Sequence, residues 1–154
     1  MGRSVFIAVM LLVALGCGSS NPDETVYREG ESPVSMVQSD DPEMARAIAK
    51  ARETVDDFIA ELGKPPRGRE FAVKVPLPTP DGNTEHIWAD TVSYRDGKFS
   101  AKLANEPLNL PGRKLGDPVE VRREDISDWM IMDGEQMIGA YTAKLLMERE
   151  AAKQ

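Results

Sequence analysis

The sequence predicts an α+β fold in which helices cover an antiparallel sheet. A stripe of apolar residues at helical spacing comes first, from Met44 to Leu62. Several short runs rich in β-branched and aromatic residues follow, separated by turns that contain Gly and Pro. A second helical stretch closes the chain. We therefore expect an N-terminal helix, an antiparallel sheet of about five strands, either open or barrel-like, and a C-terminal helix.

The first helix is expected to begin at Asp41-Pro42-Glu43. Asp41 suits the N-cap, Pro42 suits the first helical position, and Glu43 places a negative charge at the positive end of the helix dipole. Apolar residues then recur every three or four positions as far as Leu62. Gly63 predicts the end of this single helix.

Five strands are predicted, at residues 71–77, 85–94, 98–103, 119–122 and 126–132, and a closing helix at 137–152. The Asp96-Gly97 pair between the second and third strands is typical of a two-residue hairpin turn. With this turn, Tyr94 pairs with Phe99 and Asp90 pairs with Leu103. That register places the carboxylate of Asp90 on an otherwise apolar face of the sheet. The alternative is a three-residue loop, which would shift the register and remove Asp90 from that face.

The amino terminus has the features of a secretory signal peptide at residues 1–16. Arg3 supplies a positive charge, and the apolar run at 5–15 is shorter than the ~20 residues that a membrane-spanning helix needs. The four residues that end at Cys17 resemble the lipobox of bacterial lipoproteins, in which the cysteine is acylated and becomes the first residue. Cys17 is the only cysteine in the chain. The alternative is an incidental cysteine behind an ordinary signal peptide.

Residues 17–39 are expected to form a lipidated, flexible tether, because Ser, Glu, Asp, Pro and Gly predominate there. Residues 40–154 have the length of a single domain. We therefore expect an exported, membrane-anchored lipoprotein of the bacterial cell envelope. Gly18 replaces the Asp that commonly marks inner-membrane retention, which favours the outer membrane in a two-membraned cell.

The charge balance limits the possible partners. The formal net charge is −7, and it becomes −8 when residues 1–16, which contain Arg3 and no acidic residue, are removed. Nucleic acids and anionic lipids attract clustered Lys and Arg, whereas here these residues are scattered among carboxylates. The expected partners are the membrane, through the lipid on Cys17, and a protein of the envelope.

Two segments carry the candidate chemistry. His86, Trp88 and Asp90 share one face of the second predicted strand, and Asp128 and Trp129 lie on the fifth. A Ser–His–Asp triad can be drawn from Ser127, His86 and either Asp90 or Asp128. However, no nucleophile elbow and no glycine-rich oxyanion loop accompany it. The alternative is that these carboxylates hydrogen-bond within the fold and that both tryptophans belong to the core.

No cofactor or metal is expected. The chain has one histidine and no cysteine after Cys17, which is too few ligands for a transition-metal site, and it has no glycine-rich phosphate motif. We expect the candidate binding surface on the two segments described above and on the closing helix. Its residues are His86, Trp88, Asp90, Asp128, Trp129 and Tyr141.

From Asp41 onward the chain resembles the bacterial YegJ-like family, domain of unknown function 2314. The resemblance spans about residues 40–145 and lies in seven ordered motifs. These are Asp41-Pro42-Glu43-Met44 with Ala47 to Ala51, Phe71-Ala72-Val73-Lys74, Glu85-His86-Ile87-Trp88, Tyr94-x-Asp96-Gly97-x-Phe99 leading to Asn105-Glu106-Pro107, Gly116-Asp117-x-Val119-x-Val121, Ile126-x-Asp128-Trp129 and Gly139-Ala140-Tyr141-Thr142. The resemblance implies no activity, cofactor or catalytic residue.

Three functional hypotheses remain. The preferred one is a non-catalytic binding or interaction module on the envelope surface. The second is an envelope hydrolase or ligand-binding enzyme that uses His86 with Asp90 or Asp128. The third is a purely structural lipoprotein.

Overall fold

The computed structural model of the chain describes residues 25–26, 34–35 and 41–153. The predicted signal peptide at 1–16, Cys17 and most of the predicted tether therefore lie outside the described residues. Within the described part, none of the helices combines the length and the apolar character needed to cross a membrane.

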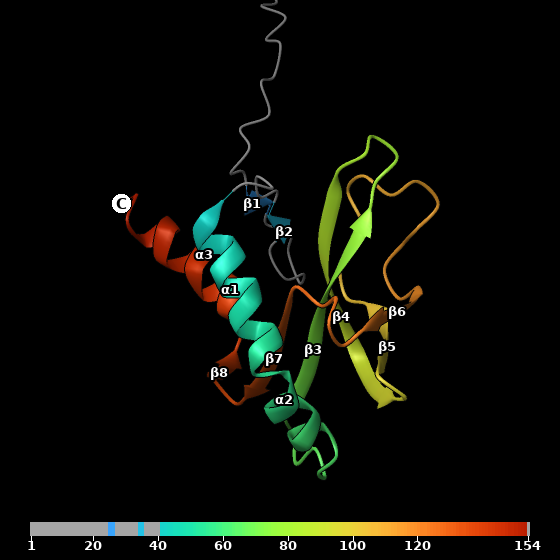
Figure 1. Ribbon diagram of the computed structural model, residues 1–154, viewed down its shortest axis with the longest axis vertical. Coiled ribbons are helices and arrows are strands. Elements are labelled where there is room, and N and C mark those ends of the chain that lie inside the picture. The colour runs from blue at the N-terminus through green and yellow to red at the C-terminus, as the bar shows by residue number, and fades with distance from the viewer. Residues whose placement is uncertain (1–24, 27–33, 36–40, 154) are drawn as a thin grey trace, which may run out of the picture.

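The predicted α+β class is confirmed. Within the described residues, three helices pack beside a six-stranded antiparallel sheet with the strand order β6-β5-β4-β3-β7-β8 (Figure 1). The strands are β3 (Glu70–Pro78), β4 (Thr84–Arg95), β5 (Lys98–Leu103), β6 (Pro118–Arg122), β7 (Asp128–Asp133) and β8 (Gln136–Gly139). The helices are α1 (Pro42–Glu53), α2 (Val55–Leu62) and α3 (Tyr141–Ala151). Because β6 and β8 remain edges, the sheet is open, and the barrel-like alternative is wrong.

The single helix predicted to end at Leu62 is divided into α1 and α2 at Thr54. Asp41 caps α1 as predicted, because its carboxylate accepts hydrogen bonds from the backbone N–H groups of Glu43 (2.9 Å) and Met44 (3.1 Å). At the break, the Thr54 hydroxyl donates to the Lys50 carbonyl (2.9 Å). The apolar stripe continues across the break, so both helices still face the sheet.

The hydrophobic core lies between these helices and one face of the sheet. Phe58 of α2 is fully buried, and its ring centroid lies 5.3 Å from Trp129, 5.8 Å from Phe99 and 6.0 Å from Phe71. Tilted aromatic pairs at these distances contribute beyond their buried area, by about 0.5–1.5 kcal/mol each. This cluster joins α2 to three strands and fixes which face of each strand points inward.

The β4–β5 hairpin forms as predicted at its turn, where Tyr94 pairs with Phe99, but its register changes further along. A bulge lies between Asp90 and Ser93, and Thr91 adopts a left-handed φ of 52°. Beyond it, Ala89 rather than Asp90 pairs with Leu103. The extra residue in the bulge moves the side chains on the far side of it from the turn to the other face of the sheet. Asp90 is therefore exposed, and its predicted position on the apolar face is wrong.

The C-terminal helix begins later than predicted. Residues Gln136–Gly139 form β8, paired with β7, and α3 begins at Tyr141. The turn between them requires left-handed backbone at Gly139 (φ 70°) and Ala140 (φ 54°). At Gly139, a Cβ atom would lie 2.5 Å from the Trp129 ring. Only glycine permits this close approach of β8 to Trp129.

Four residues of the predicted tether belong to a short strand pair. β1 (Thr25–Val26) pairs antiparallel with β2 (Val34–Ser35), and β2 lies against β4. Backbone hydrogen bonding therefore forms inside the segment that the composition assigns to a flexible tether.

Candidate functional site

A buried polar cluster lies where β3, β7 and the start of α3 meet. The Asp128 carboxylate is fully buried and accepts four hydrogen bonds. Its donors are the N–H of Trp129 (2.9 Å), the N–H of Tyr141 (3.1 Å), and both the N–H (2.8 Å) and the hydroxyl (2.6 Å) of Thr142. Ala140, in the N-cap position of α3, makes no side-chain capping bond. The first N–H groups of α3 donate instead to the Asp128 carboxylate on β7.

Lys74 completes this cluster. Its side chain is buried, its Nζ donates to the Thr142 hydroxyl (3.2 Å), and the same Nζ lies 5.3 Å from the centre of the Trp88 ring. Burial lowers the pKa of Lys74 to about 8, although the negative charge of Asp128 acts in the opposite direction. Burial likewise raises the pKa of Asp128, while bonds from Thr142 and the charge of Lys74 favour its ionised form.

His86 contacts Ser127 next to this cluster. The His86 Nδ1 atom lies 2.6 Å from the Ser127 Oγ atom, and the Ser127 N–H donates to the Lys74 carbonyl (2.8 Å). His86 is only partly buried, whereas Ser127 is almost completely buried. Desolvation lowers the pKa of His86 to about 4, helped by the positive charges of Lys74 and Arg52. The imidazole is therefore neutral at pH 7, and its lowered pKa makes it a weaker base than an ordinary histidine.

The structure brings together only part of the Ser–His–Asp triad drawn from the sequence. Ser127 and His86 are in contact, but the described structure shows no hydrogen bond between His86 and Asp128. Asp90 is exposed on the β4 bulge, where it accepts a hydrogen bond from the Thr91 hydroxyl (2.9 Å). The described residues thus place a hydroxyl and an imidazole in contact, without a carboxylate that orients the imidazole.

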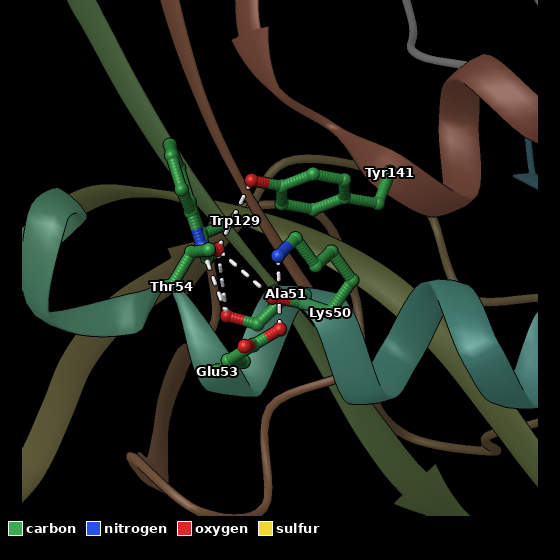
Figure 2. A network of polar contacts seen from close by, with 6 residues as sticks. All are labelled: Lys50, Ala51, Glu53, Thr54, Trp129 and Tyr141. Carbon is green, nitrogen blue, oxygen red and sulfur yellow. Dashed lines mark hydrogen bonds and ion pairs between the residues drawn. The ribbon is translucent and has the colours of Figure 1, made fainter.

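Trp129 and Tyr141, two members of the predicted binding surface, stabilise the break between α1 and α2 (Figure 2). The indole Nε1 of Trp129 donates to the Ala51 carbonyl (3.0 Å) and to the Thr54 hydroxyl (3.2 Å), which lies 3.1 Å from the Tyr141 hydroxyl. Trp129 is only 3% exposed, and its ring meets the Tyr141 ring edge-on with the centroids 5.9 Å apart. Its indole is therefore directed into the core.

The remaining members of the predicted surface are also separated. Trp88 is 4% exposed and packs against Lys74, and Asp128 is inaccessible. His86, Asp90 and Tyr141 have solvent-accessible side-chain area. The six residues do not form one continuous surface, because the two tryptophans and Asp128 are used to assemble the domain.

Sequence reasoning missed Lys74, Arg52 and Thr142 as parts of the site. Strand alternation placed Lys74 opposite the core residues Val73 and Val75, where a lysine is usually solvated. Its burial depends on packing between distant elements, which the sequence does not display. The described residues contain no group of three or more His, Cys, Asp or Glu side chains that could hold a metal ion.

The fold and the cluster define a small α+β domain in which buried Lys74 and Asp128, linked through the Thr142 hydroxyl, secure the last helix. A protein-family model described as an uncharacterized protein conserved in bacteria (DUF2314) matches residues 41–154. The chain belongs to this family, and the resemblance expected from the sequence motifs is confirmed.

Two relatives extend the comparison. The uncharacterized protein YegJ of Escherichia coli K12 is 32% identical over 145 residues, which cover 94% of this chain and 88% of YegJ. A protein of Neisseria meningitidis serogroup B with the provisional name of an ankyrin repeat protein is 35% identical over 126 residues. These residues cover 76% of this chain and 49% of the Neisseria protein. No solved structure gives a significant match.

Proposed function

We propose that the chain is an exported lipoprotein of the bacterial cell envelope whose folded domain is a non-catalytic binding module. The observation that carries the non-catalytic assignment is the position of Asp128. A Ser–His–Asp hydrolase needs a carboxylate to orient its histidine, but both oxygens of Asp128 accept hydrogen bonds that hold Trp129 and the start of α3. The accessible polar group beside this cluster is His86, which we propose as the centre of the binding surface.

The anchor is supported by the sequence alone. The apolar run at 5–15 ends in a lipobox-like segment at the only cysteine of the chain, Cys17. We expect a Cys17→Ser variant to lose its acyl chains and to leave the membrane fraction, as measured by intact mass and by fractionation. A variant that remains with the membrane and still loses its signal peptide normally contradicts the lipid anchor.

The binding role is tested with the full-length, tagged lipoprotein, crosslinked in intact envelopes. We expect one protein partner to co-purify in a fixed ratio and to be lost from a His86→Gln bait. Asp90→Asn is the matched control, because Asp90 lies on the same strand and is exposed. Both variants are checked for folding by thermal melting. A bait that captures no partner, or a partner retained equally by both variants, contradicts the binding of a protein partner at His86.

A second candidate function is an envelope hydrolase, and the 2.6 Å contact between Ser127 Oγ and His86 Nδ1 favours it. In this reaction the Ser127 oxygen would attack an acyl carbon while His86 takes the hydroxyl proton and passes it to the leaving group. Water would then hydrolyse the Ser127 ester, releasing the acid and restoring the hydroxyl. A fluorophosphonate probe tests this nucleophile directly. Labelling of the wild-type protein, absent in Ser127→Ala and greatly slowed in His86→Gln, would establish the hydrolase. An unlabelled wild-type protein rejects it.

A further inference from the structure

We infer that the ligand of the proposed binding module carries a small oxyanion group, a carboxylate or a phosphate, that binds at His86 and Arg52. This inference rests on the proposed function and specifies the chemistry recognised by the same site. It follows from the positions of the two side chains, from the hydrogen-bond donors that they present and from the charges around them.

Arg52 and His86 contact two consecutive residues of the chain, Ile126 and Ser127. The Arg52 Nε atom donates to the Ile126 carbonyl (2.8 Å), and the Ser127 hydroxyl lies 2.6 Å from His86 Nδ1. A helix residue and a strand residue are therefore held beside the same short stretch of backbone. Arg52 is exposed and His86 is partly exposed, so a solute can reach both side chains.

The two side chains present donors rather than acceptors. Ser127 is nearly completely buried, and within the described residues its hydroxyl has only His86 Nδ1 as an acceptor. Donation to Nδ1 leaves the imidazole proton on Nε2, where it can be donated to a ligand. The Arg52 guanidinium donates through Nε to the Ile126 carbonyl (2.8 Å) and through Nη2 to the Asp125 carbonyl (3.5 Å). Its remaining N–H groups suit a carboxylate or a phosphate.

The local charge has the opposite sign to that of the whole chain. The charged groups of the described structure that act on His86 are Lys74 of β3 and Arg52 of α1, and both are cations. The negative charge of β7 closest in sequence to Ser127 is Asp128, which accepts bonds from Trp129, Tyr141 and Thr142 and faces Lys74. The nearby Asp125 carboxylate lies 3.9 Å from Arg122 Nε. The cations beside His86 attract an anionic group, although the formal net charge of the whole chain is −7.

The single histidine of the chain makes the inference directly measurable. The full-length lipoprotein is prepared in neutral detergent micelles with ¹³C in the histidine ring, so that His86 gives one signal. The protein is titrated separately with acetate, inorganic phosphate and chloride at equal ionic strength. We expect a saturable shift of the His86 signal with acetate, phosphate or both, and no saturable shift with chloride.

Arg52→Gln is expected to weaken the oxyanion response about tenfold, because it removes a charge-assisted contact. Arg46→Gln is the matched control, since Arg46 is another exposed arginine of α1, and the response should not change. A response to acetate alone identifies a carboxylate ligand, and a response to phosphate alone identifies a phosphate ligand. The absence of a saturable shift with either anion, or an equal response in Arg52→Gln and the wild type, overturns the inference.

The outcomes separate this inference from the proposed function. Capture of a partner through His86 without any oxyanion response rejects the oxyanion ligand and leaves the binding module. An oxyanion response that depends on Arg52, in a protein that captures no partner, supports the ligand class and rejects the protein-interaction role.

Discussion

Protonation of His86 should destabilise the domain in mild acid. The pKa of His86 is about 4 in the folded protein, against an ordinary value of 6.5. Between these two values the unfolded chain binds a proton that the folded domain does not. The folded state therefore has its full stability above pH 6.5 and loses stability as the pH falls through 6.5 toward 4. Each pH unit in this interval costs about 1.4 kcal/mol, so the expected loss from pH 7 to pH 5 is about 2 kcal/mol.

Urea unfolding at pH 7 and pH 5, followed by tryptophan fluorescence, measures this loss. The interval is chosen because depressed carboxyl groups, such as Asp41 with a pKa of about 2, titrate mainly below it, and Lys74 with a pKa of about 8 titrates above it. His86→Gln is the control variant. Its side chain can still accept a hydrogen bond from Ser127 but does not titrate, so its stability should change about 2 kcal/mol less over the same interval. An equal pH dependence in wild type and variant would refute the assignment of a buried, neutral His86.

Two further predictions test the elements that support the site, both by urea unfolding. Asp128→Asn places an amide N–H against buried donors and leaves Lys74 without its counter-charge. We expect it to lower the free energy of unfolding by about 3–5 kcal/mol. Asp90→Asn is the control, because Asp90 is exposed, and it should change the free energy of unfolding by less than about 0.5 kcal/mol. Gly139→Ala should cost about 2 kcal/mol more than Gly134→Ala, because both have positive φ but only the Cβ at Gly139 meets Trp129, at 2.5 Å. Equal losses within either pair would show that the contact described here does not determine stability.

The elements that local signals specify were predicted well. Asp41 and Pro42 define the start of α1, and the Asp96-Gly97 turn correctly pairs Tyr94 with Phe99. These features depend on residues close together in the chain. The bulge at Thr91 was not predicted, because a two-residue turn fixes the register only until a strand gains an extra residue. The incorrect position of Asp90 follows from this one change.

The start of α3 was missed for a different reason. Ala140, which precedes the helix, gives no N-cap signal, since the acceptor for the first N–H groups is Asp128, on another strand. Methionine and isoleucine at 137 and 138 fit a helical stripe as well as a short strand. The start of α3 can therefore be recognised only from its contact with β7 in the folded structure.

The same long-range contact explains why the residues of the predicted site do not lie together in the fold. Asp128 was assigned a possible catalytic role because it follows Ser127 and resembles the carboxylate of a triad. In the fold its charge stabilises buried Lys74 and the start of α3 instead. Lys74 and Asp128 are linked through the Thr142 hydroxyl, so removing either charge leaves the other buried without compensation. What remains accessible beside them is His86 with Arg52, and a neutral imidazole among cations is suited to binding an anion rather than to strong general-base catalysis.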